Sequence, residues 1–395
     1  MTRAIWCCLA LLCAAIGASA QSVPGDGTAD PKLIPRTKAE REAQIAAHRR
    51  ILLNVQVTDP SGHAVTGLDT RDFILRINHQ PETITSFKAV QDGGATANAH
   101  AFFVIDKLNN SARDLASAHK AIEELAGSGK LLPLPTSLVV LTENGTDVSG
   151  ASRNAEVVAT GLERVTRNFH LKECTEDWNN AALGKTITIT SPDDSGDRIQ
   201  NREETADRIS NCLNERYQLS LTALLEFAHR QQHVPGRAIL IWIGPGWPIL
   251  SGPEFTPDTP DVRQSFFANL VQVSTELREG QVTLDAVSWP ASSPVAKLNP
   301  SDLETLMRGT STAAQVSARS VAMPVLAHIS GGQVYMHEKN LTPELVACLA
   351  DANSYYVLGF DSVPSAIPDE FRAIEVTVDK PGVSVRTNTE YYAQP

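Results

Sequence analysis

The feature that most constrains the fold is a regular alternation of apolar strands and amphipathic helices between residues 100 and 350. Short apolar runs bounded by polar residues are typical of strands that are buried on both faces of a sheet. Four such runs occur here: AFFVID (101–106), SLVVLT (137–142), AILIWIG (238–244) and VTLDAVS (282–288). Because helical segments separate them, the sequence predicts an α/β fold with a doubly wound, mostly parallel sheet. Ligands of such folds bind at the carboxyl ends of the strands.

Capping signals predict where the helices of this region begin and end. Ser111 and Asp114 form a capping box, which opens a helix that Gly127 ends. Asp261 is expected to cap a later helix, and Gly280 to close it. The strand that ends at Asp106 is therefore followed directly by a helix.

Antiparallel strands are predicted on both sides of the α/β region. Apolar and polar residues alternate in ILLNVQV and FILRI, around the turn DPSG, which predicts a small β module over 49–92. A similar alternation that begins at YYVLGF (355–360) predicts a C-terminal β segment over 353–395. The α/β domain then spans 98–352, with a polar insertion at 170–205 that is too long for an ordinary connection. The C-terminal segment could pair with the first β module or extend the central sheet.

The N-terminus has the pattern of a secretory signal peptide over residues 1–20. Arg3 is followed by an apolar stretch and by the small residues Ala18-Ser19-Ala20, which predict cleavage before Gln21. Residues 21–48 lack a steady period and are expected to form a flexible leader. No later run approaches the roughly 18 apolar residues of a membrane span. We therefore expect a secreted or periplasmic protein that is at most peripheral to a membrane.

The charge balance narrows the classes of partner. The chain has 34 Lys and Arg against 45 Asp and Glu, a formal net charge of −11. Removal of the signal peptide takes away one Arg and no acid, so the mature chain is slightly more acidic still. An acidic chain disfavours nucleic acid and anionic lipid as partners.

Three cysteines remain after removal of the signal peptide: Cys174, Cys212 and Cys348. Cys174 and Cys212 flank the polar insertion, and we favour a disulfide between them over the other pairings because it would fasten the insertion. Cys348 lies in the apolar helical run LVACLA and is interpreted as a buried thiol.

The order of β module, α/β domain and β tail resembles the bacterial VWFA-related family best known from Acidobacteria, which is built on a von Willebrand factor type A domain. The matching stretches include VQVTDPSGHAVTGLDTRDFILRINHQPETITSF, HAFFVIDKLNNS, VPGRAILIWIGPGWP, AHISGGQVY and SYYVLGF. They cover most of 51–393 outside the insertion. The resemblance implies a type A fold with flanking β segments.

The resemblance also implies a position for a metal site. Adhesive type A domains hold a divalent cation with Asp-x-Ser-x-Ser after the first strand, a Thr from a later loop and an Asp after the fourth strand. Here Asp106 occupies the Asp position, whereas Leu108 and Asn110 stand where the two serines should be. Thr222 is the best candidate for the Thr, and the loop GPGWP contains no acid before Glu254.

Two interpretations of Asp106 follow. Leu108 offers no oxygen to a hard cation, so we expect a degenerate site that needs no cofactor, with Asp106 stabilised by backbone N–H groups at the adjoining helix. If Mg²⁺ or Ca²⁺ does bind, the ligands would be Asp106, Asn110 and Thr222.

Other candidate sites have simpler structural explanations. His229 and His233 lie at i and i+4 without a visible third metal ligand, Asp193, Asp194 and Asp197 depart from the EF-hand pattern, and Gly331-Gly332 is interpreted as a helix stop. Trp242 is expected to be buried. Trp247 and Trp289 would either form an apolar recognition patch or cover the top of the sheet as core.

These observations predict an exported, non-catalytic protein-binding protein whose partner lies in the cell envelope or outside the cell. The expected contact surface, called the crown, comprises 106–111, 143–150, 244–254 and 288–300, with Asp106, Asn110, Ser111, Trp247 and Trp289 as its binding residues. One alternative is a divalent-cation-dependent adhesin. Another is a hydrolase that uses acids of the 170–205 insertion.

Overall fold

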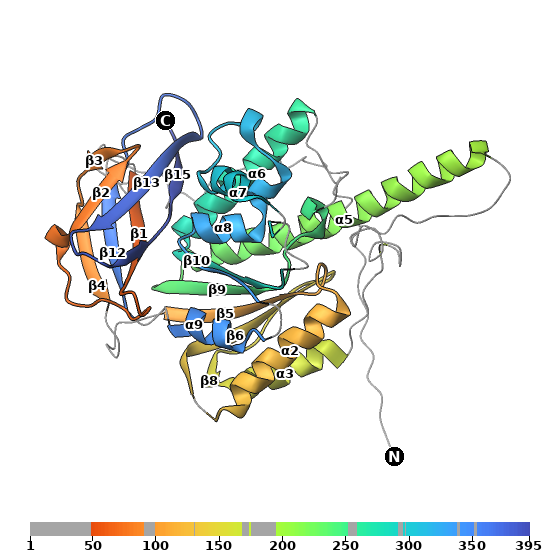
Figure 1. The fold of residues 1–395 in the computed structure, drawn as a ribbon, viewed down its shortest axis with the longest axis horizontal. Coiled ribbons are helices and arrows are strands. Elements are labelled where there is room, and N and C mark those ends of the chain that lie inside the picture. Colours follow the sequence, from red (N-terminus) through yellow and green to blue (C-terminus); the bar gives the residue numbers. More distant parts are fainter. Residues whose placement is uncertain are drawn as a thin grey trace, which may run out of the picture. The chain divides into compact units, whose positions relative to one another are not determined.

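The computed structural model describes residues 49–90, 99–129, 131–167, 174, 195–251, 259–290, 295–296, 298–337, 340–350 and 354–395 (Figure 1). The expected signal peptide and leader lie outside these residues, as do Asp193, Asp194 and Glu254. Within the described part of the chain, no helix has the length and hydropathy needed to cross a membrane.

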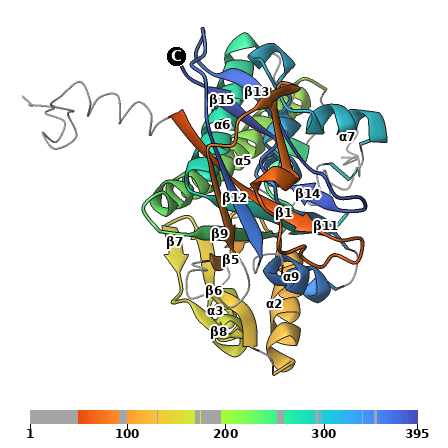
Figure 2. The same cartoon turned by 90° about the vertical axis from the view of Figure 1, so that its left-hand side faces the viewer.

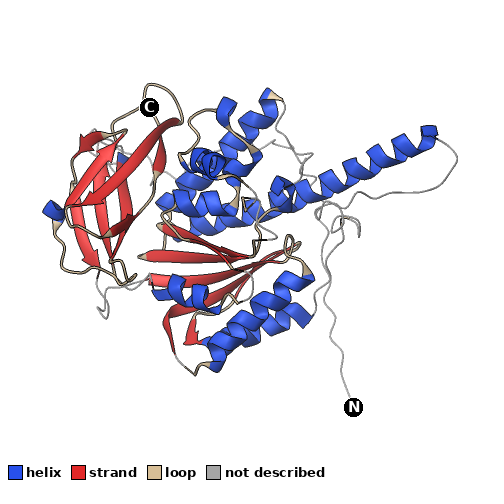
Figure 3. Cartoon of the chain, in the orientation of Figure 1, coloured by secondary structure: helices blue, strands red, loops and turns tan. Residues whose placement is uncertain are grey.

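The α/β domain is built on a central sheet in which most strands run parallel. Its strand order is β11-β10-β9-β5-β6-β7, and β8 also pairs with β6. The bounds are β5 (Ala99–Asp106), β6 (Leu131–Thr142), β7 (Gly145–Val148), β8 (Ser152–Asn154), β9 (Arg237–Ile243), β10 (Val282–Ser288) and β11 (Val334–Met336). Only β7 and β8 pair antiparallel. This confirms the predicted fold class (Figure 3).

Helices cover both faces of this sheet, and each face has its own core. One core contains side chains of α2 (Ala112–Gly127), α3 (Ala155–Arg167) and α9 (Thr342–Ala350). The other contains side chains of α5 (Ser195–Gln231), α6 (Pro260–Glu279) and α8 (Met323–Ile329). Along β5, Phe103 and Ile105 belong to the first core and Phe102 and Val104 to the second. The strand is therefore apolar throughout because both of its faces are buried.

Shorter elements complete the domain after β9 and β10. They are η3 (Pro248–Ser251), α7 (Pro300–Met307), η4 (Ala313–Gln315) and η5 (Ala318–Val321).

The helix ends follow the capping signals, with one correction. The Ser111 hydroxyl accepts the Asp114 N–H at 3.2 Å, and the Asp114 carboxylate accepts from the Ser111 hydroxyl at 2.7 Å, which confirms the capping box. The expected cap of α6 at Asp261 is wrong, because Thr259 is the N-cap and accepts the N–H of Val262 at 3.3 Å. Pro260 follows at the first helical position, which its fixed φ favours, so Asp261 lies inside the first turn.

The two terminal β segments form one sandwich, which answers the question that the sequence left open (Figure 2). One sheet has the order β14-β1-β12-β4 and the other β15-β13-β2-β3. The bounds are β1 (Arg50–Thr58), β2 (Phe73–Ile77), β3 (Gln80–Glu82), β4 (Ser86–Val90), β12 (Tyr355–Asp361), β13 (Glu370–Val378), β14 (Ser384–Arg386) and β15 (Glu390–Ala393), with η2 (Thr70–Asp72) preceding β2. The two sheets enclose a separate core that draws on both ends of the chain.

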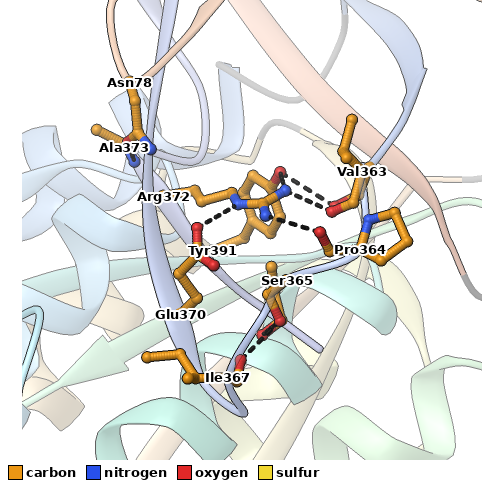
Figure 4. A network of polar contacts seen from close by, with 11 residues as sticks. Asn78, Val363, Pro364, Ser365, Ile367, Glu370, Arg372, Ala373 and Tyr391 are labelled. Atoms are coloured by element: carbon orange, nitrogen blue, oxygen red, sulfur yellow. Dashed lines mark hydrogen bonds and ion pairs between the residues drawn. The ribbon is translucent and has the colours of Figure 1, made fainter. Parts of the chain in front are cut away.

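A polar network holds the loop between β12 and β13 against the sandwich (Figure 4). The Arg372 guanidinium donates to the carbonyls of Val363 at 2.5 Å and Pro364 at 3.4 Å. Its Nε donates to Glu370 at 3.2 Å, and the guanidinium lies 5.9 Å from the centre of the Tyr391 ring. One arginine thus satisfies backbone acceptors of a loop that has no strand partner of its own.

Polar contacts attach the sandwich to the amino-terminal edge of the central sheet. Arg237, the first residue of β9, donates to Gln56 of β1 at 3.4 Å and to Thr283 at 3.1 Å. Gln281, which precedes β10, donates to the carbonyl of Leu52 at 3.2 Å. The carboxyl ends of the same strands lie at the opposite edge of the sheet, where the predicted site is.

Candidate functional site at the carboxyl edge of the sheet

The strand order has a switch point between β5 and β9. The chain continues from β5 to β6 on one side and from β9 to β10 on the other, so the connections leave in opposite directions. Such a reversal is where doubly wound sheets bind ligands, because the diverging loops leave room between them. Asp106 ends β5 and Gly244 follows β9, so both lie at this point.

The Asp106 carboxylate is buried and already bonded by protein donors. Asp106 as a whole is 1% exposed. Oδ1 accepts the backbone N–H of Leu108 at 2.9 Å, while Oδ2 accepts from the Asn109 amide at 2.8 Å and from the Ser220 hydroxyl at 2.7 Å. Burial raises the pKa of Asp106 to about 6, although the hydrogen bonds from Asn109 and Ser220 act in the opposite direction.

Trp247 extends this network into the core. Its indole Nε1 donates to the Ser220 hydroxyl at 2.7 Å, so Ser220 links the tryptophan to Asp106. The Trp247 ring makes edge contacts with Tyr217 and Trp242, at 5.0 and 6.1 Å between centroids. Trp247 is 0% exposed, so it covers the top of the sheet and does not form a surface patch.

The other two tryptophans of this region differ in exposure. Trp242 is buried, as predicted. Trp289 is half-buried and packs against the core beneath α2 and α9. Of the two crown tryptophans, only Trp289 is therefore partly exposed.

Asn110 joins the loop after β5 to the loop after β9. Its Nδ2 donates to the carbonyl of Ile243 at 3.1 Å, and its buried Oδ1 lacks a hydrogen-bond partner. Gly244 adopts φ +143°, and a Cβ at this position would lie 2.2 Å from Asn110 Oδ1. Glycine is needed here for its backbone conformation and for this close approach. Ser111, the N-cap of α2, is half-buried beside it.

The hydroxyl that reaches Asp106 comes from Ser220, whereas Thr222, the residue expected from the resemblance, is exposed on α5. The sequence contains a signal that distinguishes them. Tyr217, Leu221 and Leu224 are buried at helical spacing, and Ser220 shares their face of the helix. Two residues further on, Thr222 lies off that face, so helical periodicity would have selected the serine.

The residues around Asp106 do not fit a divalent cation. Hard cations need several oxygen ligands, but Leu108 directs an N–H at the carboxylate and the Asn109 amide and Ser220 hydroxyl donate to it as well. The Ser220 oxygen is itself occupied by the Trp247 indole N–H. Throughout the described ranges, no three His, Cys, Asp or Glu side chains come together as metal ligands would.

The remaining candidates have local roles. His229 contacts Glu276 at 3.3 Å, and its ring lies 5.9 Å from that of the exposed His233. Gly331 and Gly332 follow the end of α8, where a Cβ on Gly332 would lie 1.9 Å from the carbonyl of Leu284. These glycines end a helix and allow close packing.

The predicted disulfide between Cys174 and Cys212 is confirmed. Its Cα atoms are 5.6 Å apart, and 38 positions separate the two residues in sequence. The bond fastens Cys174 to α5, two helical turns before Ser220. Cys348 keeps a fully buried thiol in α9, as expected.

Comparisons with known proteins give distant structural similarities and no sequence match. No family model matches the chain, and no curated protein matches its sequence. Among solved structures, the chain is similar to an aerotolerance-related membrane protein from Bacteroides fragilis NCTC 9343, crystallised with multiple mutations to serines. The identity is 10% and the TM-score 0.31, over 65% of this chain and 99% of that one.

Proposed function

We propose that this chain is an exported, non-catalytic protein-binding protein that uses the crown of its α/β domain without a metal ion. The observation that carries the proposal is the closed hydrogen-bond network of Asp106. In the type A domains that the sequence resembles, the equivalent Asp binds a cation. Here three protein donors occupy its two oxygens, so the loops are held together without one.

The burial of Asp106 also favours binding over catalysis. A general base or nucleophile must reach its substrate, whereas this carboxylate is almost inaccessible and bonded on both oxygens. The hydrolase alternative rests on acids of the 170–205 insertion, most of which lies outside the described residues. No contact in the described part of the chain favours it.

Exposed and partly exposed residues for a partner lie at the same edge of the sheet as this closed centre. Glu143 and Asn144 are exposed in the turn between β6 and β7, Met336 is 40% exposed at the end of β11, and Trp289 is half-buried after β10. All four follow or end strands of the central sheet at its carboxyl edge. They offer a mixed polar and apolar surface of the kind that protein interfaces use.

Export is part of the proposal because two features support it. Residues 1–20 have the pattern of a signal peptide, and the chain contains a disulfide, which persists in oxidising compartments. The partner would then be a protein of the cell envelope or of the exterior.

A photo-cross-linking amino acid at Asn144 tests the surface, with the same substitution at exposed Thr83 of the sandwich as the matched control. In the producing cell, we expect a specific cross-link from position 144, unchanged by EDTA, and none from position 83. A cross-link that EDTA abolishes would favour the divalent-dependent adhesin, and its absence at position 144 would contradict the proposal.

A separate experiment with the purified chain tests whether it binds a divalent cation. The melting temperature should be the same in EDTA and in millimolar Mg²⁺, Mn²⁺ or Ca²⁺, because both oxygens of Asp106 already accept hydrogen bonds from protein donors. A rise of several degrees that Asp106→Ala removes would show that the site binds the cation.

A further inference from the structure

Residues 308–322, called the α7–α8 segment, connect α7 to α8 and contain η4 and η5. Glu390, at the start of β15 in the sandwich, lies against the beginning of this segment and is 2% exposed. A Cβ on Gly309 would lie 2.1 Å from Glu390 Oε2, and Gly309 adopts φ +87°, so both the contact and the backbone conformation require glycine. The buried Glu390 carboxyl therefore packs directly on the backbone of the α7–α8 segment.

The hydroxyl of Tyr392 lies within hydrogen-bonding distance of two acceptors. It is 2.9 Å from the carbonyl oxygen of Thr310 and 3.1 Å from Glu390 Oε1. A tyrosine hydroxyl has only one proton to donate. When that proton goes to Thr310, the contact with Glu390 is complete only if the carboxyl is protonated and donates to the tyrosine oxygen. The two distances therefore fit a chain of hydrogen bonds that runs from protonated Glu390 through Tyr392 to Thr310.

Ionisation of Glu390 would break this chain. A carboxylate is a stronger acceptor than a carbonyl group, because charge-assisted hydrogen bonds are about twice as strong as neutral ones. Tyr392 would then donate to Glu390, and the carbonyl of the buried Thr310 would lose this donor. A buried acceptor that loses its donor costs free energy. This cost favours separation of the α7–α8 segment from β15.

A series of contacts joins Thr310 to the crown. The Thr310 hydroxyl lies 3.3 Å from the hydroxyl of Ser320 in η5, and both residues are buried. η5 contacts η3, which belongs to the crown loop after β9. Met323 follows η5 and packs closely on this loop, since a Cβ on Gly246 would lie 2.7 Å from the Met323 Cγ. The α7–α8 segment therefore lies between the sandwich and the crown loop.

We propose that the Glu390 carboxyl is a proton-operated latch that holds the α7–α8 segment and, through it, the crown loop after β9. Protonation closes the latch, because the carboxyl then donates to Tyr392 and Tyr392 donates to Thr310. Loss of the proton opens it. The inference goes beyond the proposed function, since it concerns how the chain itself responds to pH and requires no partner.

Burial determines the direction of the response. It raises the pKa of Glu390 to about 7, while the hydrogen bond from Tyr392 acts in the opposite direction. The latch is therefore closed in mildly acidic solution and opens as the pH rises through about 7.

Other titratable groups lie on the elements that pack around Glu390. They are Arg263 and Arg278 on α6, which lies beside β15 (Figure 1), Arg308 after α7, His328 on α8, and Asp369 and Arg372 at β13. Of these, His328 has an ordinary pKa closest to the range of the latch, and burial lowers it. His328 should therefore titrate at a lower pH than Glu390.

Backbone amide resonances of the purified chain test the latch between about pH 5.5 and about pH 8.5. Gly309, Ser320 and Gly246 should shift together with a midpoint near pH 7. Glu390→Gln keeps a neutral donor beside the tyrosine at every pH, so these resonances should stay at the positions that the native chain has in acid. Glu143→Gln alters an exposed glutamate and should titrate like the native chain.

A second variant breaks the link itself. Tyr392→Phe keeps the ring that packs on Phe267, at 5.8 Å between centroids, but removes the hydroxyl that joins Glu390 to Thr310. Its resonances in the α7–α8 segment should match those of the native chain at about pH 8.5 over the whole range. Near-native circular dichroism would show that the variant is folded.

Two outcomes would overturn the latch. If Gly309 titrates near pH 7 while Ser320 and Gly246 do not, the effect of Glu390 stays local. If Glu390→Gln retains the shared titration, another group such as His328 is responsible. Either failure leaves the cross-link test at Asn144 unaffected, so the proposed function stands or falls separately.

Discussion

At the residue scale, the crown is held by side chains that bond one another across three elements. Asp106 ends β5, Ser220 lies on α5, and Trp247 follows β9. Each polar atom in this chain of contacts is buried, so losing one partner leaves another donor or acceptor unsatisfied at a cost of about 1–3 kcal/mol. The network therefore makes the loop arrangement specific as well as stable.

Gly244→Ala tests the contact between the two crown loops. A Cβ would lie 2.2 Å from Asn110 Oδ1, and the backbone has φ +143°, so both contact and strain oppose the alanine. We expect a loss of about 2–4 kcal/mol in the free energy of unfolding, measured by urea denaturation. Gly145→Ala is the control, because Gly145 has φ +120° but nothing within 4 Å of its Cβ position. Equal losses in the two variants would exclude the Asn110 contact as a cause.

Glu390 should make stability depend on pH. It is buried at the start of β15, accepts from the Tyr392 hydroxyl at 3.1 Å, and burial raises its pKa from 4.5 to about 7. Between pH 4.5 and 7, the folded state holds a proton on Glu390 that the unfolded state releases. The free energy of unfolding is therefore highest below pH 4.5, and it falls as the pH rises towards 7.

Glu390→Gln removes that dependence. Relative to the native chain, the variant should gain up to about 3 kcal/mol between pH 4.5 and 8, as measured by urea unfolding at several pH values. Exposed Glu143→Gln serves as the control. A constant difference between Glu390→Gln and the native chain across this range would contradict the prediction.

At the scale of elements, α5 depends on its disulfide as well as on packing. The bond between Cys174 and Cys212 closes a loop of 38 positions. By the chain-entropy estimate, such a cross-link stabilises the fold by about 3–4 kcal/mol.

Reduction, or the double substitution Cys174→Ser and Cys212→Ser, should lower the melting temperature and speed amide exchange in α5 around Arg216. Calorimetry and hydrogen exchange measure both effects. The reductant should not alter the double variant, since Cys348 already carries a thiol. A native melting temperature after complete reduction would show that packing alone holds the helix.

At the scale of the whole molecule, the sandwich couples the two ends of the chain. β1 lies between β12 and β14, and β2 pairs with β13, so the strands of 49–90 depend on partners in 354–395. These partners lie roughly 300 positions away, and neither segment encloses a core by itself.

Deletion of 354–395 should therefore unfold the first β segment. Amide exchange of β1 and β2 should approach the rate of an unfolded chain, while β5 and β9, inside the central sheet, remain protected. Adding a 354–395 fragment in trans should restore protection of β1. Persistent protection of β1 in the truncated chain would show that the first module folds alone.

Much of the architecture was predictable from local pattern. The apolar runs that become β5, β9 and β10, the capping box at Ser111, and the pairing of Cys174 with Cys212 all followed from residue type and spacing. The spacing of buried positions along a helix or strand depends on residues that are close in sequence. It can therefore be read from the pattern of apolar residues.

Tertiary structure alone decided which surfaces meet. Trp247 could be core or patch until its indole was placed against Ser220. The joining of the two terminal β segments was likewise undecided. The spacing of apolar residues shows that one face of a helix or strand is buried, but it does not identify the segment that covers this face. That segment is determined by packing between parts of the chain that lie far apart in sequence.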